Sequence, residues 1–321
     1  MDNEIKVSIY CLSYNHAQYL VQTIEGIVNQ KTNFNFELLI HDDASTDGSN
    51  QIILNYQKKY PNIIKPIIQK ENQYSKGINI SKEILFPLFK GKYVAICEGD
   101  DYWTNENKLQ RQFDFLEEHP DYSACVHNTK ILLDGKDINL NVNSIQYDTT
   151  LDIYKMIKTG ANQYQTSSVM YRKELMVKEN RPHFVEMING VGDYPLSVYL
   201  AVSGKVYYFK DVMSTYRIST KNSWTATVKN NKSKFLVVKE QAIEMLKEAN
   251  AYSKYKYDNE FKRAILWQKY EAALLNPNSK YPLMDYFKVI QDEPVKTKVK
   301  IFLQLYVPML YSLLSNKRYK I

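Results

Sequence analysis

Residues 90–103 read Lys-Gly-Lys-Tyr-Val-Ala-Ile-Cys-Glu-Gly-Asp-Asp-Tyr-Trp, a short apolar run that ends in an acidic cluster. The run Tyr93–Cys97 predicts a buried strand. The following Glu98-Gly99-Asp100-Asp101 places three carboxylates within four residues, which repel one another unless a cation lies among them. Gly99 lets a ligand approach the backbone closely. The stretch predicts a strand with a cation-binding loop at its carboxyl end, and a purely structural loop is the alternative.

The sequence before this stretch alternates between strands and helices. Strands are predicted at Val7–Leu12, Phe36–His41 and Ile63–Ile68. The first helix follows Asn15, a plausible N-cap, and the second follows Ser45 or Thr46. Such alternation is typical of an α/β protein with a mostly parallel sheet flanked by helices, in which ligands bind beyond the carboxyl ends of the strands.

The pattern changes after residue 130. Strands are predicted at Ala124–Asn128, Val169–Tyr171, Val206–Phe209 and Val212–Ile218, and helices at Leu151–Lys158 and Asp193–Val202. From Lys229 onward the pattern is helical. A prior of ~150 residues per domain makes the chain one large domain or two. We therefore predict an α/β domain over residues 1–225, with halves at 1–130 and 131–225, and a helical C-terminal region over 226–321.

Two further polar clusters follow predicted strands. Leu12-Ser13-Tyr14-Asn15-His16 offers backbone groups and an aromatic ring that could hold a flat base, and an ordinary strand-to-helix turn is the alternative. His41-Asp42-Asp43 opens an Asp-rich run with a faint likeness to an EF-hand loop. The twelfth position, where that loop needs Glu, is Leu54, so a calcium loop is excluded. Two adjacent acids exceed what helix capping requires, although capping alone stays open.

Composition limits the class of protein. Apolar residues make up 44% and charged residues 24%, which is ordinary for a soluble globular protein. Six of the basic residues lie in residues 294–321, a segment without Asp or Glu, so the rest of the chain is nearly neutral. This distribution argues against nucleic-acid binding. Cys11, Cys97 and Cys125 fit reduced thiols, and no signal peptide or membrane span is evident, so we expect a cytoplasmic protein.

In this order and spacing, Ser13-Tyr14-Asn15, the run Asp42–Gly48 and residues 90–103 resemble the family 2 glycosyltransferases, which have the GT-A (Rossmann-like) fold. The continuation from Lys108 to Ser123 looks like the bacterial members that build surface polysaccharides. The resemblance is strong over residues 5–130 and traceable to about residue 225. It implies that the chain binds a nucleoside-diphosphate sugar at the carboxyl edge of the sheet.

The resemblance assigns the nucleotide contacts by position. Ser13, Tyr14 and Asn15, together with Leu12, stand where the family contacts the base and the ribose. Asp43 stands where the family accepts a hydrogen bond from uracil, which favours UDP.

The acidic loop occupies the position of the family's Asp-x-Asp motif. Asp100 would ligate Mn²⁺ or Mg²⁺, and Asp101 would add negative charge beside the metal. Glu98 and Gly99 would face the ribose, the sugar donor or the water shell of the metal. Glu98 replaces the first Asp of the family and adds one methylene group.

The resemblance also implies a catalytic base. Family members carry an acid at the start of a helix after the acceptor-binding segment, and Asp193 fits that place. An inverting transfer needs such a base on the acceptor hydroxyl. Taken alone, Asp193 would read as a helix N-cap before Pro195.

Two further segments are compared with the family. The polar run Gln165–Ser168 could touch acceptor or diphosphate. Tyr216-Arg217 lacks the His that often follows in related sequences, so Arg217 is interpreted as structural.

The resulting hypothesis is an inverting, metal-dependent glycosyltransferase. It would move a sugar from a nucleoside-diphosphate sugar to a glycan or lipid-linked glycan in bacterial surface-polysaccharide biosynthesis. A nucleotidyltransferase is one alternative, but Ser13–Gln18 lacks the Gly-rich phosphate loop expected of it. A catalytically silent nucleotide-sugar-binding protein is the other.

The C-terminal tail predicts a contact with membrane. Residues 296–321 place an apolar run between two groups of three Lys or Arg residues. Such a helix suits the surface of an anionic membrane, where each cation contributes ~1 kcal/mol. We therefore expect a peripheral location on the inner face of the plasma membrane. A helix packed on the catalytic domain, with Pro308 at a bend, is the alternative.

Overall fold

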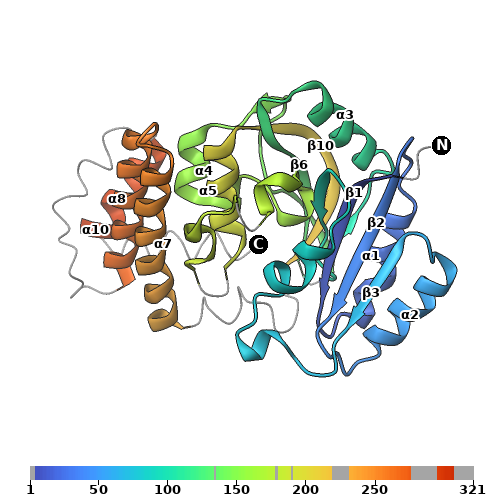
Figure 1. Cartoon of the computed structure of the whole chain (residues 1–321). Coiled ribbons are helices and arrows are strands. Elements are labelled where there is room, and N and C mark those ends of the chain that lie inside the picture. The colour runs from blue at the N-terminus through green and yellow to red at the C-terminus, as the bar shows by residue number, and fades with distance from the viewer. Residues whose placement is uncertain are drawn as a thin grey trace.

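The computed structural model describes residues 4–133, 135–177, 180–188, 191–218, 231–275 and 295–306. It shows an α/β fold in which helices flank a curled sheet and a helical region follows (Figure 1). The strands are β1 Ile5–Ser13, β2 Asn35–Asp42, β3 Ile64–Ile68, β4 Tyr93–Ile96, β5 Tyr102–Trp103, β6 Tyr122–Leu133, β7 Lys136–Asn141, β8 Thr149–Thr150, β9 Met170–Arg172 and β10 Lys205–Ile218. The α-helices are α1 Ala17–Val28, α2 Ser49–Lys59, α3 Lys108–Glu118, α4 Ile153–Thr159, α5 Asp193–Ser203, α7 Lys232–Tyr252, α8 Asp258–Leu275 and α10 Val295–Tyr306.

The sheet has a parallel half and a mixed half. Its strand order is β3-β2-β1-β4-β9-β6-β10-β5, with β7 beside β6 and β8 beside β10. Neighbouring strands from β3 to β4 are parallel, which aligns their carboxyl ends at one edge. The short β9 is antiparallel to both β4 and β6, and it joins the two halves.

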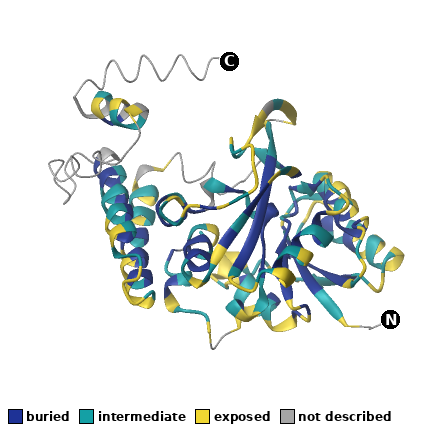
Figure 2. Ribbon diagram, turned by 90° about the horizontal axis from the view of Figure 1, so that it is seen from above, coloured by how far each residue is buried: buried dark blue, intermediate teal, exposed yellow. Residues whose placement is uncertain are grey.

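Each face of the sheet supports its own core, because side chains alternate along a strand. Figure 2 shows the central strands as buried. On one face, Ile9 and Cys11 of β1 pack in a core with residues of α1, α2 and α3. On the other face, Tyr10 packs in a core that includes residues of α4, α5, α7 and α8. The paired helices α7 and α8 therefore share a core with the α/β part of the chain.

The predicted order of strands and helices is confirmed, but some details are wrong. The two strands predicted over Val206–Ile218 form the single strand β10. The predicted caps Ser45 and Thr46 do not cap α2, which begins at Ser49 after Gly48 with a φ of 94°. The short strands β5, β7 and β8 were not predicted, since each pairs with a strand that is distant in sequence or makes a local hairpin. The division at residue 225 stays a prediction.

The described part of the chain contains no helix that combines the length and the apolar character of a bilayer span. The predicted tail lies only partly within it, because α10 ends at Tyr306 and residues 307–321 lie outside the described residues.

Candidate active site

The three predicted polar clusters meet at one edge of the sheet. β1 runs parallel to β2, and Ser13 pairs with Asp42 at their carboxyl ends. On the other side of β1, the N–H of Gly99 donates to the carbonyl oxygen of Leu12 at 2.9 Å. The acidic loop therefore continues along the same edge, next to the first cluster.

Asn15 links the first two clusters instead of capping α1. Its φ of 56° is a left-handed conformation, which Asn tolerates better than most residues. Its Oδ1 accepts a hydrogen bond from the N–H of Thr46 at 2.9 Å, and its own N–H donates to Ser45 Oγ at 2.9 Å. The prediction that Asn15 is the N-cap is wrong, because the N–H of Ala17 at the start of α1 donates to Asp47 at 2.8 Å.

Both acids of the second cluster are buried and hydrogen-bonded within the protein. Asp42 accepts hydrogen bonds from the N–H and the hydroxyl of Ser45. The carboxylate of Asp43, which is 3% exposed, accepts from the N–H of Gln73 at 2.7 Å and of Tyr74 at 3.1 Å. A carboxylate has about four acceptor sites. Asp43 can therefore accept a further hydrogen bond from a bound base while it holds residues 73 and 74 beside β2.

Polar atoms around Gly99 are poised for a ligand. Ser13 Oγ and His16 Nδ1 are buried and have no hydrogen-bond partner in the described part of the chain. Such atoms cost stability unless a ligand or water satisfies them. A Cβ atom on Gly99 would lie 2.6 Å from His16 Nδ1 and 2.9 Å from the Leu12 carbonyl oxygen, so the position requires glycine. Tyr14, at 45% exposed, presents its ring at the surface nearby.

The backbone of the acidic loop is fixed by two side chains from other elements. Thr23 Oγ1 on α1 lies 2.6 Å from the carbonyl oxygen of Asp101 and 3.1 Å from that of Gly99. The guanidinium of Arg217, near the end of β10, donates to the carbonyl oxygen of Asp100. Arg217 thus binds the Asp100 carbonyl, and the single hydroxyl hydrogen of Thr23 lies closest to the Asp101 carbonyl.

Asp100 and Asp101 occupy different environments. Asp101 is 1% exposed, and its Oδ1 accepts a hydrogen bond from the backbone N–H of Arg217 at 3.1 Å. Asp100 is only partly buried. Of the two predicted metal ligands, Asp100 is accessible to a ligand, whereas the Asp101 carboxylate ties the loop to β10.

The electrostatics of the acidic loop also involve Asp193. Burial, followed by the charges of Asp100 and Asp193, raises the pKa of Glu98 to about 8. Desolvation by surrounding protein atoms also raises the pKa of the Asp193 carboxyl, although the residue as a whole is exposed. The first residue of α5 therefore lies within electrostatic reach of the loop after β4.

The donor set fits a hard divalent cation that protein and substrate hold together. Repulsion among Glu98, Asp100 and Asp193 would be relieved by a cation. Within the described ranges, no three His, Cys, Asp or Glu side chains make a metal-binding group by themselves. Mg²⁺ usually binds through one or two carboxylates and substrate phosphates. Asp100, with Glu98 beside it, suits this mode.

The residues that support the acidic loop from behind were not predicted from the sequence. Ser167 and Ser168, predicted as possible substrate contacts, are fully buried. The indole N–H of Trp103 donates to the Ser167 carbonyl at 2.8 Å, and Gln112 Nε2 donates to the Ser168 carbonyl at 2.9 Å. A polar run before a strand gives no signal that separates such a buried support from a substrate contact.

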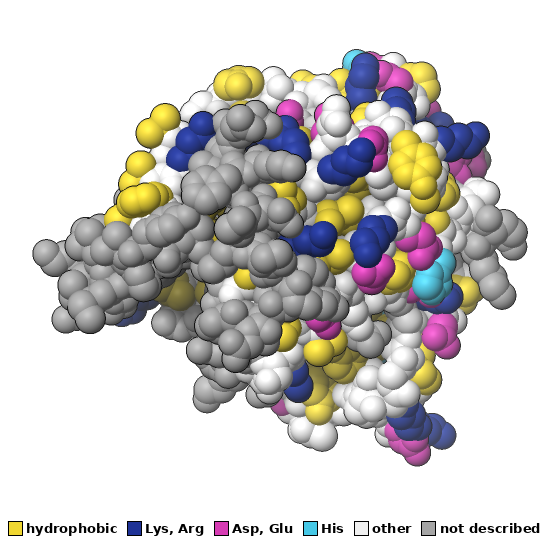
Figure 3. Space-filling model, turned by 90° about the vertical axis from the view of Figure 1, so that its left-hand side faces the viewer, with side chains coloured by type: hydrophobic (Ala, Val, Ile, Leu, Met, Phe, Trp, Pro, Cys, Tyr) yellow, Lys and Arg dark blue, Asp and Glu magenta, His cyan; other side chains and the backbone are white. Residues whose placement is uncertain are grey.

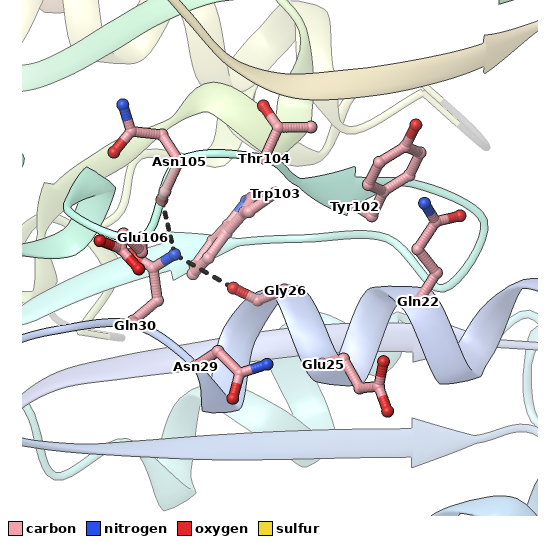
Figure 4. Close-up of a pocket in the computed structure, with 10 residues that line it drawn as sticks. All are labelled: Gln22, Glu25, Gly26, Asn29, Gln30, Tyr102, Trp103, Thr104, Asn105 and Glu106. Carbon is pink, nitrogen blue, oxygen red and sulfur yellow. Dashed lines mark hydrogen bonds between the residues drawn. The ribbon is translucent and has the colours of Figure 1, made fainter.

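A hollow of about 330 Å³ lies beside the acidic loop, between α1 and residues 102–106 (Figure 4). The side chain of Gln30 links the two sides of this hollow, because its Nε2 donates to the carbonyl oxygens of Gly26 at 3.0 Å and Asn105 at 2.8 Å. None of the predicted site residues lines this hollow. It therefore flanks the candidate active site and is separate from it.

Comparison with known proteins identifies the family. Residues 8–178, more than half of the chain, match the family model described as Glycosyl transferase family 2. The Mycobacterium tuberculosis protein named Uncharacterized protein Rv1520 is 31% identical over 220 residues, which are 68% of this chain and 60% of that protein. Escherichia coli WfaP, named UDP-Glc:alpha-D-GlcNAc-diphosphoundecaprenol beta-1,3-glucosyltransferase, is 35% identical over 113 residues, 35% of this chain and 41% of WfaP. The chain thus spans at most about 60% of the length of these relatives.

Solved structures agree with the fold. Staphylococcus aureus TarS 1-349 in complex with UDP matches with a TM-score of 0.60 and 18% identity, over 97% of this chain and 83% of that one. The mannosyltransferase PcManGT from Pyrobaculum calidifontis, in complex with GDP-Man and Mn²⁺, matches with a TM-score of 0.52 and 14% identity, over 99% of this chain and 88% of that one. At these identities the likeness concerns the fold, and it confirms the predicted GT-A fold. Together with the family match over residues 8–178, it shows that the chain belongs to glycosyl transferase family 2.

Proposed function

We propose that the protein is an inverting glycosyltransferase that moves a sugar from a nucleoside-diphosphate donor to an acceptor hydroxyl. The observation that carries the proposal is the meeting of three clusters at the carboxyl ends of β1, β2 and β4, with Asp193 of α5 close enough to raise the pKa of Glu98. Family membership supports sugar transfer as the reaction class.

The nucleotide would bind over the edge formed by β1 and β2. Leu12, Ser13 and Tyr14 line the end of β1. Ser13 Oγ, which has no hydrogen-bond partner among the described residues, is available to a ribose or phosphate oxygen. Asp43 retains acceptor capacity for the N–H of a uracil ring. TarS, which shares the fold, binds UDP in its crystal structure, and this likeness also favours UDP here.

A divalent cation would be held by Asp100, with Glu98 beside it and Asp101 behind it. When bound, Mn²⁺ or Mg²⁺ neutralises charge that develops on the departing nucleoside diphosphate. The Mn²⁺ in the PcManGT complex supports the use of a metal on this fold.

Asp193 would act as the general base. Its carboxylate takes the proton of the acceptor hydroxyl while that oxygen forms a bond to the anomeric carbon. The bond from the anomeric carbon to the diphosphate breaks on the opposite face, so the configuration inverts. A positioned base of this kind contributes ~10²–10⁴-fold to the rate. The raised pKa of Asp193 brings it closer to the working pH of such a base.

The acceptor is proposed to be a glycan or a lipid-linked glycan of a bacterial surface polysaccharide. The printed name of WfaP describes a diphosphoundecaprenol-linked acceptor for that relative, and 35% identity over 113 residues supports a similar acceptor class here.

A donor and acceptor screen tests the proposal. UDP release would be measured for a panel of nucleotide sugars with and without Mn²⁺, in the presence of lipid-linked and soluble glycan acceptors. We expect metal-dependent UDP release that rises with one acceptor and is abolished in Asp100→Asn, whose melting temperature should stay at the wild-type value. Binding of UDP without release from any donor would instead favour a nucleotide-sugar-binding protein.

We also propose that α10 contacts an anionic membrane. Val295, Val299 and Phe302 lie on one face of α10 and are 75%, 51% and 54% exposed. Ile301 on the opposite face is 1% exposed and packs with Tyr270 of α8. The buried Ile301 agrees with the alternative of a packed helix, and the exposed apolar face supports the proposed contact with membrane. Six Lys and Arg residues and no acid in residues 294–321 provide the complementary charge.

The membrane proposal is tested by sedimentation with phosphatidylglycerol vesicles. The full chain should bind at low salt and dissociate as salt rises, whereas Val299→Glu/Phe302→Glu should remain in the supernatant. Val237→Glu is a matched control, because Val237 is 53% exposed on α7. Figure 3 shows Lys and Arg side chains interspersed with Asp and Glu side chains on the described part of one face of the molecule. Equal sedimentation of all three proteins would contradict the proposal.

A further inference from the structure

We propose that Arg217 is the positioning residue that orients Asp100 toward the cation and the donor diphosphate. Arg217 lies near the end of β10, far in sequence from the acidic loop. Its guanidinium donates one hydrogen bond to the carbonyl oxygen of Asp100 and another to Oε1 of Gln22 on α1. Its backbone N–H donates to the carboxylate of Asp101 at 3.1 Å. Arg217 therefore binds both the backbone carbonyl of Asp100 and the carboxylate of Asp101.

Aromatic rings fix the direction of the guanidinium. Its central carbon lies 4.9 Å from the ring centroid of Tyr19 and 4.5 Å from that of Tyr102. Both distances are typical of cation–π contacts. Tyr19 belongs to α1 and Tyr102 to β5, the strand that directly follows the acidic loop. Arg217 is therefore held from two elements while it contacts the loop.

These contacts give Arg217 a role that differs from a direct contact with the substrate. The fork-shaped guanidinium is engaged by a backbone carbonyl and a side-chain amide, and the rings of Tyr19 and Tyr102 flank it. Thr23 holds the carbonyl groups of Gly99 and Asp101 but not that of Asp100. The Asp100 carbonyl instead accepts its hydrogen bond from the Arg217 guanidinium.

The orientation of Asp100 matters because metal geometry is strict. Mg²⁺ demands near-ideal octahedral geometry at 2.0–2.1 Å, so even a small rotation of the peptide group would move the carboxylate out of place. Misplacement by about 1 Å can cost 10²-fold in rate. Loss of Arg217 should thus weaken the cation site more than the nucleotide site.

The inference rests on the proposed use of a metal, and calorimetry separates the two. UDP affinity is measured with and without Mn²⁺ in wild type, Arg217→Met, Arg217→Lys and Gln22→Ala. We expect Mn²⁺ to tighten UDP binding in wild type. In Arg217→Met this enhancement should fall at least ten-fold while the affinity for UDP alone stays within two-fold. Arg217→Lys should recover part of it, and Gln22→Ala should lose a smaller part.

Arg172→Met is the matched structural control. Arg172 also donates to backbone carbonyl groups, those of Tyr122, Leu116 and His119, but it pairs with the start of β4 and not with its carboxyl end. Its loss should lower the melting temperature and leave the Mn²⁺ enhancement of UDP binding intact.

Two outcomes in Arg217→Met overturn the inference. One is full Mn²⁺ enhancement of UDP binding. The other is weaker binding of UDP alone, which would indicate a direct phosphate contact. Should Arg217→Met fail to fold, full enhancement in both Arg217→Lys and Gln22→Ala overturns it. No enhancement in wild type would overturn the metal proposal itself and this inference with it.

Discussion

Substitution of Asp193 should affect the transfer reaction without affecting the binding of UDP. Asp193→Asn removes the proposed base but leaves the edges of β1, β2 and β4 unchanged. We expect UDP affinity to be retained and transfer to fall by ~10²–10⁴-fold. The check is calorimetry with UDP together with an assay of glycan product, and transfer within a few-fold of wild type would place the base elsewhere.

The raised pKa of Asp193 predicts a direction for the pH dependence. The base works only when it is deprotonated, so kcat/KM should fall as pH drops through a value above the ordinary 3.8 of Asp. The free energy of unfolding should depend on pH in the opposite direction. Because the pKa of Asp193 is raised in the folded state, its contribution to stability is lost as pH rises through that pKa. Asp193→Asn should therefore be at least as stable as wild type at pH 7, as measured by urea unfolding, and a marked loss of stability would contradict this assignment.

Asp43 combines a proposed ligand contact with a structural one. Its carboxylate accepts hydrogen bonds from the N–H groups of Gln73 and Tyr74. Asp43→Ala should weaken UDP binding by about 1.5–3 kcal/mol, as expected for a lost hydrogen bond to a charged group, and should also lower the melting temperature. Calorimetry with UDP checks the first effect. A lower melting temperature with unchanged UDP affinity would leave Asp43 only its structural role.

Gly99 tests how closely the acidic loop approaches β1. Gly99→Ala would place its Cβ 2.9 Å from the backbone oxygen of Leu12, which cannot move as a flexible side chain can. We expect a loss of about 1–3 kcal/mol in the free energy of unfolding, as for overpacking elsewhere. Gly192→Ala is the control, because no atom of the described residues, apart from its two chain neighbours, lies within 4 Å of its Cβ position. Equal stability of the two variants would show that the loop is free to shift.

At the scale of elements, α3 carries a buried lysine behind the site. Lys108 is 0% exposed, and its Nζ donates to Gln112 at 2.7 Å and lies 3.8 Å from the ring centroid of Trp103. Burial lowers the pKa of Lys108 from 10.5 to about 7. The unfolded chain therefore binds more protons between pH 7 and 10.5, and this group makes stability rise with pH across that window.

Lys108→Met should remove that part of the pH dependence. At pH 6 the variant should be more stable than wild type by on the order of 1–3 kcal/mol, because charging Lys108 in the core is no longer required. The difference should shrink at pH 9. Urea unfolding at both values checks this, with Lys92→Met as a control, since Lys92 lies at the surface in an ion pair with Glu117. A constant difference between pH 6 and 9 would contradict the lowered pKa.

Sequence patterns predicted the elements well where burial is regular. The apolar runs of β1, β2 and β4 and the acidic residues after them carry local signals that do not depend on distant partners. The predicted helix N-caps were wrong because capping does depend on residues that are distant in sequence. Asn15 bonds to Thr46, and Asp47 caps α1, so the choice among these polar residues is made by a neighbouring loop. The contact of Arg217 with Asp100 could not be predicted, because it spans 117 residues of sequence.

At the scale of the molecule, the helical region could be predicted from its periodicity but its packing could not. The residues of α7 and α8 that enter the core shared with α4 and α5 include Ala242, Met245 and Phe261. Gln268 of α8 also donates to the Lys158 carbonyl at 3.2 Å, at the end of α4. A helical pattern alone does not indicate which surface will cover its apolar side. These contacts join α7 and α8 to the core of the α/β part, while the division at residue 225 stays a prediction.

The shared core predicts a single unfolding transition. Phe261→Ala removes a fully buried ring from α8 and should cost about 3–5 kcal/mol. Because the core on that face also contains Tyr10 of β1, the loss should destabilise the α/β part together with the helices. Far-UV circular dichroism should report a single transition in urea for both wild type and Phe261→Ala, and UDP binding should be lost at the same urea concentration. Val237→Ala, at an exposed position on α7, should change stability by no more than about 0.5 kcal/mol. If Phe261→Ala instead unfolds in two steps, with UDP binding retained after the first, the helical region is an independent unit attached to the catalytic fold.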